Sequence, residues 1–361
     1  MLLKNNYMWK KFILIILLIP YLSMNCTTNS GKESSIEING EWQLQGVEQL
    51  EINNINSKIN PLLISTSSGI YTLEEGDFSE FGLQDKPIVN ITHIKENTYL
   101  AAIETFHLEN GDTTLYKTDD SGQTWTSHMN NYGGSDNKYT MITDLQIKES
   151  GSSVIFACGG GNIARTTDEG STWESVFLTW EHLGKAIFVK SDIYNPNIIW
   201  AGGENAIFQP TLIKSEDGGD SWDRIKIYEN IEAANNDIII NQKDAKNLLI
   251  GLSGSVASAN KIRRSLDDGE TWDTVFEGAS IHTFTHSASN PEIVYASGRN
   301  PEGRLFFLAS NNFGDTWQTI EHPESPSNIY VNDMVSVTEE GQEVIYLGTN
   351  KGLYSFTVQS Y

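Results

Sequence analysis

The stretch "RSLDDGETW", residues Arg264–Trp272, decides how this chain folds, because the chain carries it five times in related form. It combines three carboxylates with a serine and a threonine, and such a cluster can either carry out chemistry or hold a tight turn. The other copies are "KTDDSGQTW" (117–125), "RTTDEGSTW" (165–173), "KSEDGGDSW" (214–222) and "ASNNFGDTW" (309–317). Repetition of this kind is expected of a structural element rather than of a single catalytic centre.

The copies follow one another at a nearly constant interval. Their central glycines are 45 to 50 residues apart, which indicates stacked supersecondary units. Between them lie short alternating stretches such as "NIIWAGG" (197–203) and "EVIYLGT" (343–349), typical of strands that end in glycine-rich turns. Four strands of five or six residues with their turns fill about 48 residues, which is the content of one β-propeller blade.

Each copy has the residues expected of a tight turn held by its own hydrogen bonds. The central glycine permits a positive φ, and the carboxylate two residues earlier can accept backbone N–H groups across the turn. The closing tryptophan can bury a large ring between blades. Because an amide can hold a turn but cannot act as a general acid or base, the asparagine in the fifth copy favours a structural role. The residues at this position are Asp120, Asp168, Asp217, Asp267 and Asn312.

These stretches resemble the Asp-box, or bacterial neuraminidase repeat, found in sialidases, xyloglucan hydrolases, sortilin-type receptors and photosystem II assembly factor propellers. In those families the box joins the third and fourth strands of a blade and lies away from the ligand site. The resemblance therefore implies a propeller whose ligand site is on the face opposite the boxes.

The chain has enough strands for seven blades. Six are expected at about residues 47–83, 84–131, 132–180, 181–232, 233–278 and 279–324. The last segment offers only three strands, and "INGEWQLQG" (38–46) supplies the missing one. We therefore predict an all-β fold formed by residues 38–361, a seven-bladed β-propeller of four-stranded antiparallel blades in which the N-terminal strand closes the last blade.

The first 25 residues differ from the rest of the chain. Three lysines precede the apolar run "FILIILLIP" (12–20), which is too short to span a bilayer and is typical of a signal peptide. Cys26 follows where bacterial lipoproteins carry their acylated cysteine, and residues 26–37 would then be the lipidated cysteine and a flexible tether. Because Ser23 and Asn25 depart from the usual lipoprotein motif, an ordinary signal peptide cleaved nearby is the alternative.

The overall charge excludes several kinds of partner. The chain has a net charge of −23, which repels nucleic acid and anionic membranes. No helix start follows the glycine-rich stretches at 158–162 and 252–260, so we expect no phosphate-binding loop. Without paired histidine or cysteine spacing we expect neither a metal nor another cofactor. We expect a monomer that contacts the membrane only through its lipid anchor.

Two groups of residues are candidate ligand sites. In "TWEHLG" (179–184), Trp180, Glu181 and His182 could stack on and hydrogen-bond a sugar, although Trp180 could equally pack between blades. The second group is a ring at the mouth of the central channel, with three aspartates as its core and a cation as its expected ligand. The alternative is a channel whose acids are fully solvated. Alignment of the blades gives the ring as Asn90, Asp144, Lys185, Asp237, His282 and Asp333.

Residue counts argue against the enzymes of the resembled families. Sialidases surround their substrate with three arginines, but only Arg263, Arg299 and Arg304 are free of box strands here, and they lie on neighbouring blades. Xyloglucan hydrolases take one catalytic Asp from each of two propellers. We therefore expect a secreted, lipid-anchored envelope module that binds a protein or glycan, with a glycoside hydrolase as the alternative. Two carboxylates about 5–10 Å apart in a deep pocket would favour the hydrolase.

Overall fold

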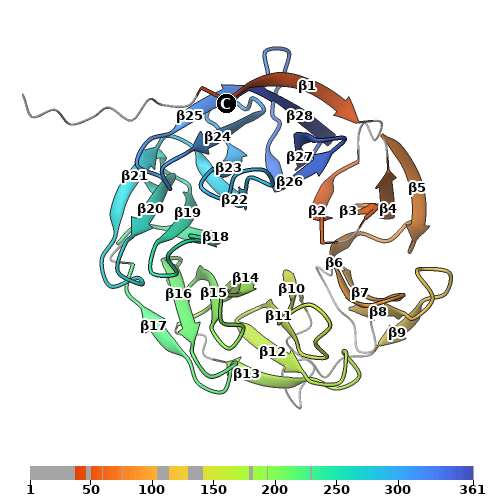
Figure 1. Cartoon of the computed structure of the whole chain (residues 1–361). Coiled ribbons are helices and arrows are strands. Elements are labelled where there is room, and N and C mark those ends of the chain that lie inside the picture. Colours follow the sequence, from red (N-terminus) through yellow and green to blue (C-terminus); the bar gives the residue numbers. More distant parts are fainter. Residues whose placement is uncertain are drawn as a thin grey trace, which may run out of the picture. The chain divides into compact units, whose positions relative to one another are not determined.

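The computed structural model shows seven antiparallel sheets arranged as the blades of a ring (Figure 1). Each sheet has four strands, so the predicted seven-bladed propeller is confirmed. The predicted signal peptide and Cys26 lie outside the described residues. Those described are 37–45, 50–58, 60–74, 76–103, 114–128, 141–178, 182–192, 194–227 and 230–360.

Blades 1 to 3 each contain four strands in sequence order from the centre outward. Blade 1 consists of β2 (Ile52–Asn56), β3 (Leu62–Thr66), β4 (Gly69–Glu74) and β5 (Asp77–Gly82). Blade 2 consists of β6 (Ile88–Lys95), β7 (Thr98–Ile103), β8 (Leu115–Thr118) and β9 (Thr126–His128). Blade 3 consists of β10 (Asp144–Ile147), β11 (Ile155–Gly159), β12 (Asn162–Thr166) and β13 (Glu174–Leu178).

Blades 4 to 6 repeat this arrangement. Blade 4 consists of β14 (Lys185–Ser191), β15 (Ile199–Glu204), β16 (Pro210–Ser215) and β17 (Asp223–Ile225). Blade 5 consists of β18 (Ala233–Ile240), β19 (Leu248–Gly254), β20 (Lys261–Ser265) and β21 (Asp273–Glu277), with a 3₁₀ turn, η1 (Ala257–Ala259), before β20. Blade 6 consists of β22 (Ser280–His286), β23 (Val294–Arg299), β24 (Phe306–Ser310) and β25 (Gln318–Glu321).

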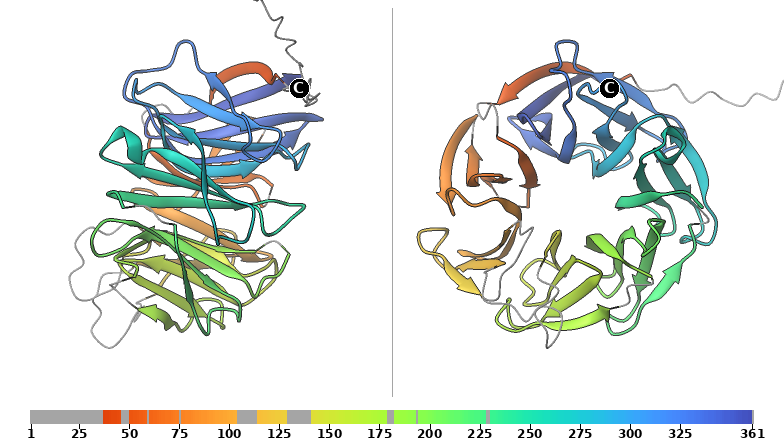
Figure 2. Two further views of the ribbon diagram at one scale, coloured as in Figure 1. Left: turned by 90° about the vertical axis from the view of Figure 1, so that its left-hand side faces the viewer. Right: turned by 180° about the vertical axis from the view of Figure 1, so that it is seen from behind.

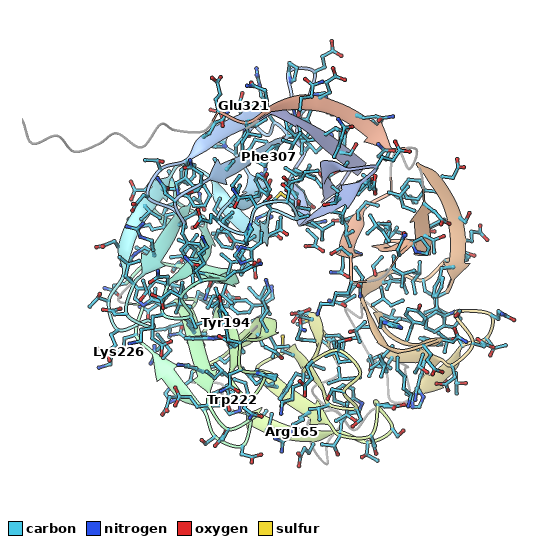
Figure 3. The ribbon with its side chains drawn as sticks, viewed as in Figure 1. Arg165, Tyr194, Trp222, Lys226, Phe307 and Glu321 are labelled. Carbon is cyan, nitrogen blue, oxygen red and sulfur yellow. The ribbon has the colours of Figure 1, made fainter. Side chains whose placement is uncertain are left out.

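Blade 7 is shared by the two ends of the propeller. It consists of β26 (Val331–Glu339), β27 (Gln342–Thr349), β28 (Gly352–Ser360) and β1 (Asn39–Gln45). The outermost strand β1 pairs antiparallel with β28, as predicted for the N-terminal strand. The indole of Trp42 contacts the rings of Phe356 (5.2 Å between centroids) and Phe307 (5.6 Å). This strand therefore closes blade 7 and also packs against blade 6, where Phe307 lies (Figure 3).

The second and third strands of the blades form the hydrophobic core. Every residue of β3 and of β24 is buried, because both faces of a middle strand are covered by neighbouring blades. These strands therefore read as nearly continuous apolar runs rather than the alternation inferred from the sequence. The innermost strands contact one another in order around the ring, from β2 through β26 and back to β2. Views from the two faces, in Figure 1 and on the right of Figure 2, show them surrounding one axis.

The five repeated stretches, here called the box turns, join the third and fourth strands of blades 2 to 6. In the opening example, Asp267 Oδ1 accepts the backbone N–H of Thr271 and the hydroxyl of Ser265, both at 2.8 Å. The N–H of Gly269, at φ 88°, donates to Ser265 Oγ (2.8 Å). The indole N–H of Trp272 donates to the Gly269 carbonyl (3.0 Å). The carboxylate therefore holds the turn.

The other four box turns repeat the central hydrogen bond. The donors are the N–H groups of Thr124 to Asp120 (2.8 Å), Thr172 to Asp168 (2.7 Å), Ser221 to Asp217 (2.8 Å) and Thr316 to Asn312 (3.0 Å). In the fifth turn Asn312 Nδ2 donates to Thr316 Oγ1 (2.9 Å), where the aspartates accept a hydroxyl instead. An amide can therefore replace the carboxylate because the role is to close a turn.

The strand order gives the propeller two different faces. Because the strands of a blade alternate in direction, the first-to-second and third-to-fourth turns lie on one side, here called the box face. The second-to-third turns and the connections between blades lie on the other, here called the loop face. The innermost strands therefore start at the loop face. No helix in the described part of the chain is long and apolar enough to span a membrane.

Candidate functional site

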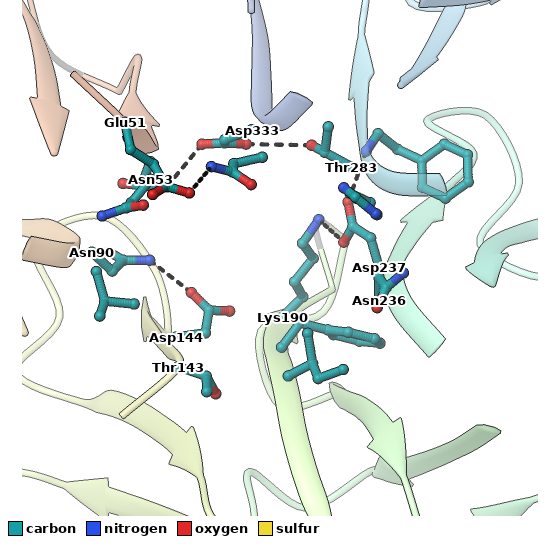
Figure 4. A pocket seen from close by; sticks show the side chains of 17 residues that line it. Glu51, Asn53, Asn90, Thr143, Asp144, Lys190, Asn236, Asp237, Thr283 and Asp333 are labelled. Carbon is teal, nitrogen blue, oxygen red and sulfur yellow. Dashed lines mark hydrogen bonds and ion pairs between the residues drawn. The ribbon is translucent and has the colours of Figure 1, made fainter. Parts of the chain in front are cut away.

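A polar pocket of about 370 Å³ lies where the starts of the seven innermost strands converge (Figure 4). Every blade contributes two consecutive residues to its lining, and Glu51, Lys190 and Phe284 complete it. The seven pairs are Asn53–Asn54, Val89–Asn90, Thr143–Asp144, Ile187–Phe188, Asn236–Asp237, His282–Thr283 and Asn332–Asp333.

β-Bulges explain why two adjacent residues can both face the pocket. In a regular strand neighbouring side chains point to opposite faces, and an extra residue re-aims one of them. In blade 5, Asn235 pairs with Leu252 and Asp237 with Gly251, which leaves Asn236 as the extra residue. The innermost strands of blades 1, 2, 4, 6 and 7 have the same register shift at their starts.

A glycine on the second strand makes room for such a bulge. In blade 6, a Cβ added to Gly298 would lie 2.2 Å from the backbone carbonyl oxygen of Ser280. Since this oxygen belongs to the backbone, no side-chain rotation could relieve the clash. The glycine-rich ends of the second strands therefore help to position the pocket.

Three of the lining residues are aspartates that bind the next blade. Each carboxylate accepts a backbone N–H from the innermost strand of that blade, so it fastens two blades together. The bonds are Val189 N–H to Asp144 (3.0 Å), Phe284 N–H to Asp237 (2.8 Å) and Ile55 N–H to Asp333 (2.8 Å). The same carboxylates also accept the N–H of the residue that follows each of them.

Further side-chain bonds join the remaining blades, so that hydrogen bonds link the blades all the way round the pocket. Blades 1 and 2 are joined by Asn53 Nδ2 to the Ile88 carbonyl (2.8 Å), and blades 2 and 3 by Asn90 Nδ2 to Asp144 (2.8 Å). Blades 4 and 5 are joined by Lys190 Nζ to Asp237 (2.5 Å), and blades 6 and 7 by the Thr283 hydroxyl to Asp333 (3.3 Å). These acids therefore hold the ring together, whatever else they bind.

Burial dominates the electrostatics of the pocket. It raises the pKa of Asp144 to about 6, although the Val189 N–H and the charge of Lys190 act in the opposite direction. Burial also raises the pKa of Asp333. It would lower the pKa of Lys190, but the carboxylate of Asp237 raises that pKa above its ordinary value. Lys190 therefore remains a paired ammonium.

The structure brings together most of the predicted ring. Asn90, Asp144, Asp237, His282 and Asp333 all line the pocket, whereas the predicted Lys185 does not. Lys185 is exposed, and its backbone is paired with that of Glu204 where β14 begins.

The error at Lys185 has a simple cause. The bulge of blade 4 lies between Ala186 and Phe188, so Phe188 occupies the place equivalent to the aspartates. The ammonium group in the pocket comes instead from Lys190, two residues further along the same strand.

The other predicted site is separate from this pocket. Trp180 and Glu181 lie outside the described residues. His182 is half-buried and does not line the pocket, and its buried Nδ1 has no hydrogen-bond partner in the structure.

Alignment by box turns also missed several polar residues that line the pocket. They are Glu51, Asn53, Asn54, Asn236 and Asn332. The available signal was a polar dipeptide near the start of several innermost strands, such as "ND" at 236–237 and again at 332–333.

The described residues give no sign of a metal site. No group of three or more His, Cys, Asp or Glu side chains in that part of the chain is arranged to hold a metal ion. Cys158 is buried beside Thr143, and burial raises the pKa of its thiol. Such a thiol is poorly suited to nucleophilic or ligand chemistry.

No family model matches this chain, and no curated protein sequence matches it. Solved structures do. The GH74 xyloglucanase from Xanthomonas campestris has a TM-score of 0.65 and 12% identity, over 88% of this chain and 53% of that one. YCF48 from Cyanidioschyzon merolae has a TM-score of 0.59 and 14% identity, over 87% and 98%. A structure of YCF48 bound to D1 peptide has a TM-score of 0.59 and 15% identity, over 90% and 100%.

These likenesses establish the fold alone. The chain spans about half the length of the GH74 xyloglucanase and nearly all of YCF48. It is therefore a seven-bladed propeller with both a GH74 xyloglucanase and YCF48 among its structural neighbours, and its activity has to be argued from its own residues.

Proposed function

We propose that this protein is a binding module of the cell envelope that holds a segment of a partner polypeptide at its loop-face pocket. The observation that carries the proposal is the fixed polar lining. Its carboxylates are held by backbone N–H groups of neighbouring blades, which suits a preformed recognition site. A preformed site binds without the entropic cost of ordering its own side chains.

The structural neighbours are compatible with this function. YCF48, which this chain matches over almost its whole length, has been solved bound to a peptide. A single propeller of this size can therefore hold a polypeptide segment without a second domain.

Export and anchoring are part of the same proposal. They rest on the signal-like residues 1–25 and on the position of Cys26. A Cys26→Ala variant should lose its acyl label and leave the membrane fraction, because one acylated residue would carry the attachment. Acylated, membrane-bound Cys26→Ala protein would contradict the anchor but not the binding site.

Site-specific photo-crosslinking in the native envelope tests the binding face. Two exposed apolar residues serve as a matched pair: Ile207 in the second-to-third turn of blade 4, on the loop face, and Leu266 in a box turn. We expect a crosslinker at Ile207 to capture a discrete polypeptide and one at Leu266 to capture none. Capture from Leu266 alone would show that the box face binds.

One observation favours a glycoside hydrolase as the second candidate. Asp144 has its pKa raised to about 6 in a pocket with two further aspartates, and a glycoside hydrolase needs such a carboxyl as its general acid. Against this, both oxygens of Asp144 already accept hydrogen bonds, from Asn90 and Leu145 on one and Val189 on the other. We expect no release of reducing ends from xyloglucan or of sialic acid from sialosides. Release that Asp144→Asn abolishes would favour the hydrolase.

A further inference from the structure

The amide side chains in the pocket are all oriented in the same sense. The Nδ2 groups of Asn53, Asn236 and Asn332 donate to backbone carbonyls, at 2.8, 2.8 and 3.0 Å respectively. Those of Asn54 and Asn90 donate to carboxylates, at 2.9 and 2.8 Å. Because carbonyl and carboxylate oxygens accept and an amide NH₂ only donates, these contacts distinguish Nδ2 from Oδ1 in each amide.

This orientation leaves five amide oxygens available as acceptors. No donor in the described residues reaches Oδ1 of any of the five asparagines. Asn90 is only 9% exposed, and its unpartnered oxygen belongs to a side chain that lines the pocket. None of the five oxygens is among the fully buried side-chain atoms that lack a partner, so they are open to the pocket. Independently of the carboxylates, they therefore offer acceptors to a ligand with hydrogen-bond donors.

His282 adds another acceptor to the lining. Its Nδ1 lies 2.8 Å from the Val331 carbonyl oxygen, which can only accept, so Nδ1 carries the proton. Burial lowers the pKa of His282, and the ring is therefore neutral near pH 7. In a neutral imidazole the other nitrogen carries a lone pair, so Nε2 is an acceptor on the pocket wall.

The charges of the lining also favour a ligand that donates hydrogen bonds. Asp144, Asp237, Asp333 and Glu51 contribute four carboxylates to the lining, whose one ammonium, that of Lys190, is already paired. The Lys58 ammonium, which is not part of the lining, also acts on Asp144. Glu51 differs from the aspartates, because its carboxylate accepts only from the Tyr330 hydroxyl and from Asn332, both at 3.3 Å. It is thus the pocket acid that no backbone N–H of the described chain holds.

We propose that the pocket binds the guanidinium of an arginine side chain on the partner polypeptide. A guanidinium carries five N–H donors and no acceptor, and so matches a wall of amide oxygens, carboxylates and an imidazole lone pair. An anionic or acceptor-rich group would meet unpaired lone pairs and like charge. The proposal rests on the proposed binding function and names the chemical group that would enter the pocket.

Short peptides test the charge and the shape of the ligand separately. The amidated series Gly-Gly-X-Gly-Gly, with X as arginine, citrulline, lysine or norleucine, is titrated into the full-length protein at low ionic strength. Citrulline keeps the shape of arginine but has no charge. We expect arginine to bind about tenfold more tightly than citrulline, because charge-assisted hydrogen bonds are lost. Equal binding of arginine and citrulline, or of arginine and lysine, would overturn the proposal.

Two matched pairs of variants place the peptide in the pocket. Glu51→Gln should weaken binding of the arginine peptide several-fold, whereas Glu41→Gln, an equal charge change on the exposed outer strand β1, should leave it unchanged. Val89→Lys, which adds an ammonium to the lining, should abolish binding, and Val89→Gln should not. Thermal unfolding checks that each variant is folded. Unchanged binding in both Glu51→Gln and Val89→Lys would show that arginine binds elsewhere.

The outcomes separate this inference from the proposed function. A partner crosslinked from Ile207 together with no preference for arginine would overturn the guanidinium ligand and leave the binding module intact. Failure of the crosslink to capture any polypeptide, with no peptide binding, would overturn both.

Discussion

Aspartates occupy two regions of this propeller, and the same side chain has opposite properties in them. In the box turns, hydrogen bonds from Ser221 lower the pKa of Asp217 to about 2. In the central pocket, burial raises the pKa of Asp144 to about 6. Both carboxylates accept a backbone N–H and other donors, so hydrogen bonding alone does not explain the difference.

Two physical differences separate the regions. A box aspartate keeps most of its hydration, so hydrogen bonds decide its pKa. A pocket aspartate has lost water, which disfavours its ionised form and raises its pKa. A box aspartate also binds only four residues ahead, as Asp217 does with Ser221. A pocket aspartate reaches a neighbouring blade, as Asp237 does with Phe284. One holds a turn, and the other holds the ring.

The largest effect should follow from removing a pocket aspartate. Asp237→Ala leaves the Lys190 ammonium and the Phe284 N–H without their partner between three blades. We expect the free energy of unfolding to fall by about 3 kcal/mol, because the buried Phe284 N–H is left unsatisfied and the half-buried Lys190 ammonium loses its ion pair. Chemical denaturation measures this directly.

A double variant provides the control for that experiment. Removing the ammonium as well, in Asp237→Ala with Lys190→Met, should recover part of the lost stability, because no unpaired charge remains. If the double variant is less stable than Asp237→Ala alone, the pair is not the source of the effect.

A smaller effect should follow from removing a box aspartate. Asp168→Ala frees the Thr172 N–H, but this group lies at the surface where water can bind it. We expect the thermal midpoint to fall by roughly 2–4 °C, with crosslinking from Ile207 unchanged. A loss of stability as large as that of Asp237→Ala would mean that the two regions do not differ as described.

The smallest effect is a dependence of stability on pH that distinguishes the regions. Asp144 favours its protonated form in the folded state, so its contribution to stability is lost as the pH rises from 3.8 through about 6. Asp217 favours its ionised form, so its contribution is lost as the pH falls from 3.8 through about 2. These two groups by themselves place the highest free energy of unfolding near about pH 4, whereas His282, whose pKa burial lowers, acts in the opposite direction, because its contribution is lost as the pH falls below 6.5.

The variant Asp144→Asn tests whether Asp144 causes the loss of stability as the pH rises. Between pH 4 and pH 6 its free energy of unfolding should fall less, or rise more, than that of the parent chain, even if the variant is less stable throughout. Lys58, Lys190 and Asp237 also act on Asp144 and remain in place. If the free energy of unfolding depends on pH in the same way in parent and variant, groups other than Asp144 cause the dependence.

Much of the fold could be predicted from the sequence because the repeat is local. The hydrogen bonds of a box turn join residues a few positions apart: Thr271 donates to Asp267, and Trp272 donates to Gly269. The same short pattern therefore produces the same structure wherever it occurs. Five blades follow from the five copies, and the other two follow from the strands that the remaining segments offer. Closure by "INGEWQLQG" also follows, because a ring with one blade short of a strand can be completed only by the other end of the chain.

The site could be predicted only in part. Three aspartates were placed correctly in the pocket because each lies near the start of the innermost strand that follows a box turn. Lys185 was placed wrongly because it lies three residues before Phe188, which follows the bulge of β14 and takes the place of the aspartates. A bulge leaves little trace in the sequence. The neighbouring asparagines were missed for the same reason.

The repeated blade, the turns that close it and the acidic character of the chain follow from the sequence alone, since these depend on contacts within a few residues and on composition. The folded ring is needed to show which side chains meet at the axis, how each amide is oriented and which carboxylates lose their water. These properties depend on contacts between blades some 45 to 50 residues apart, and on bulges whose position is set by the packing of one strand against the next.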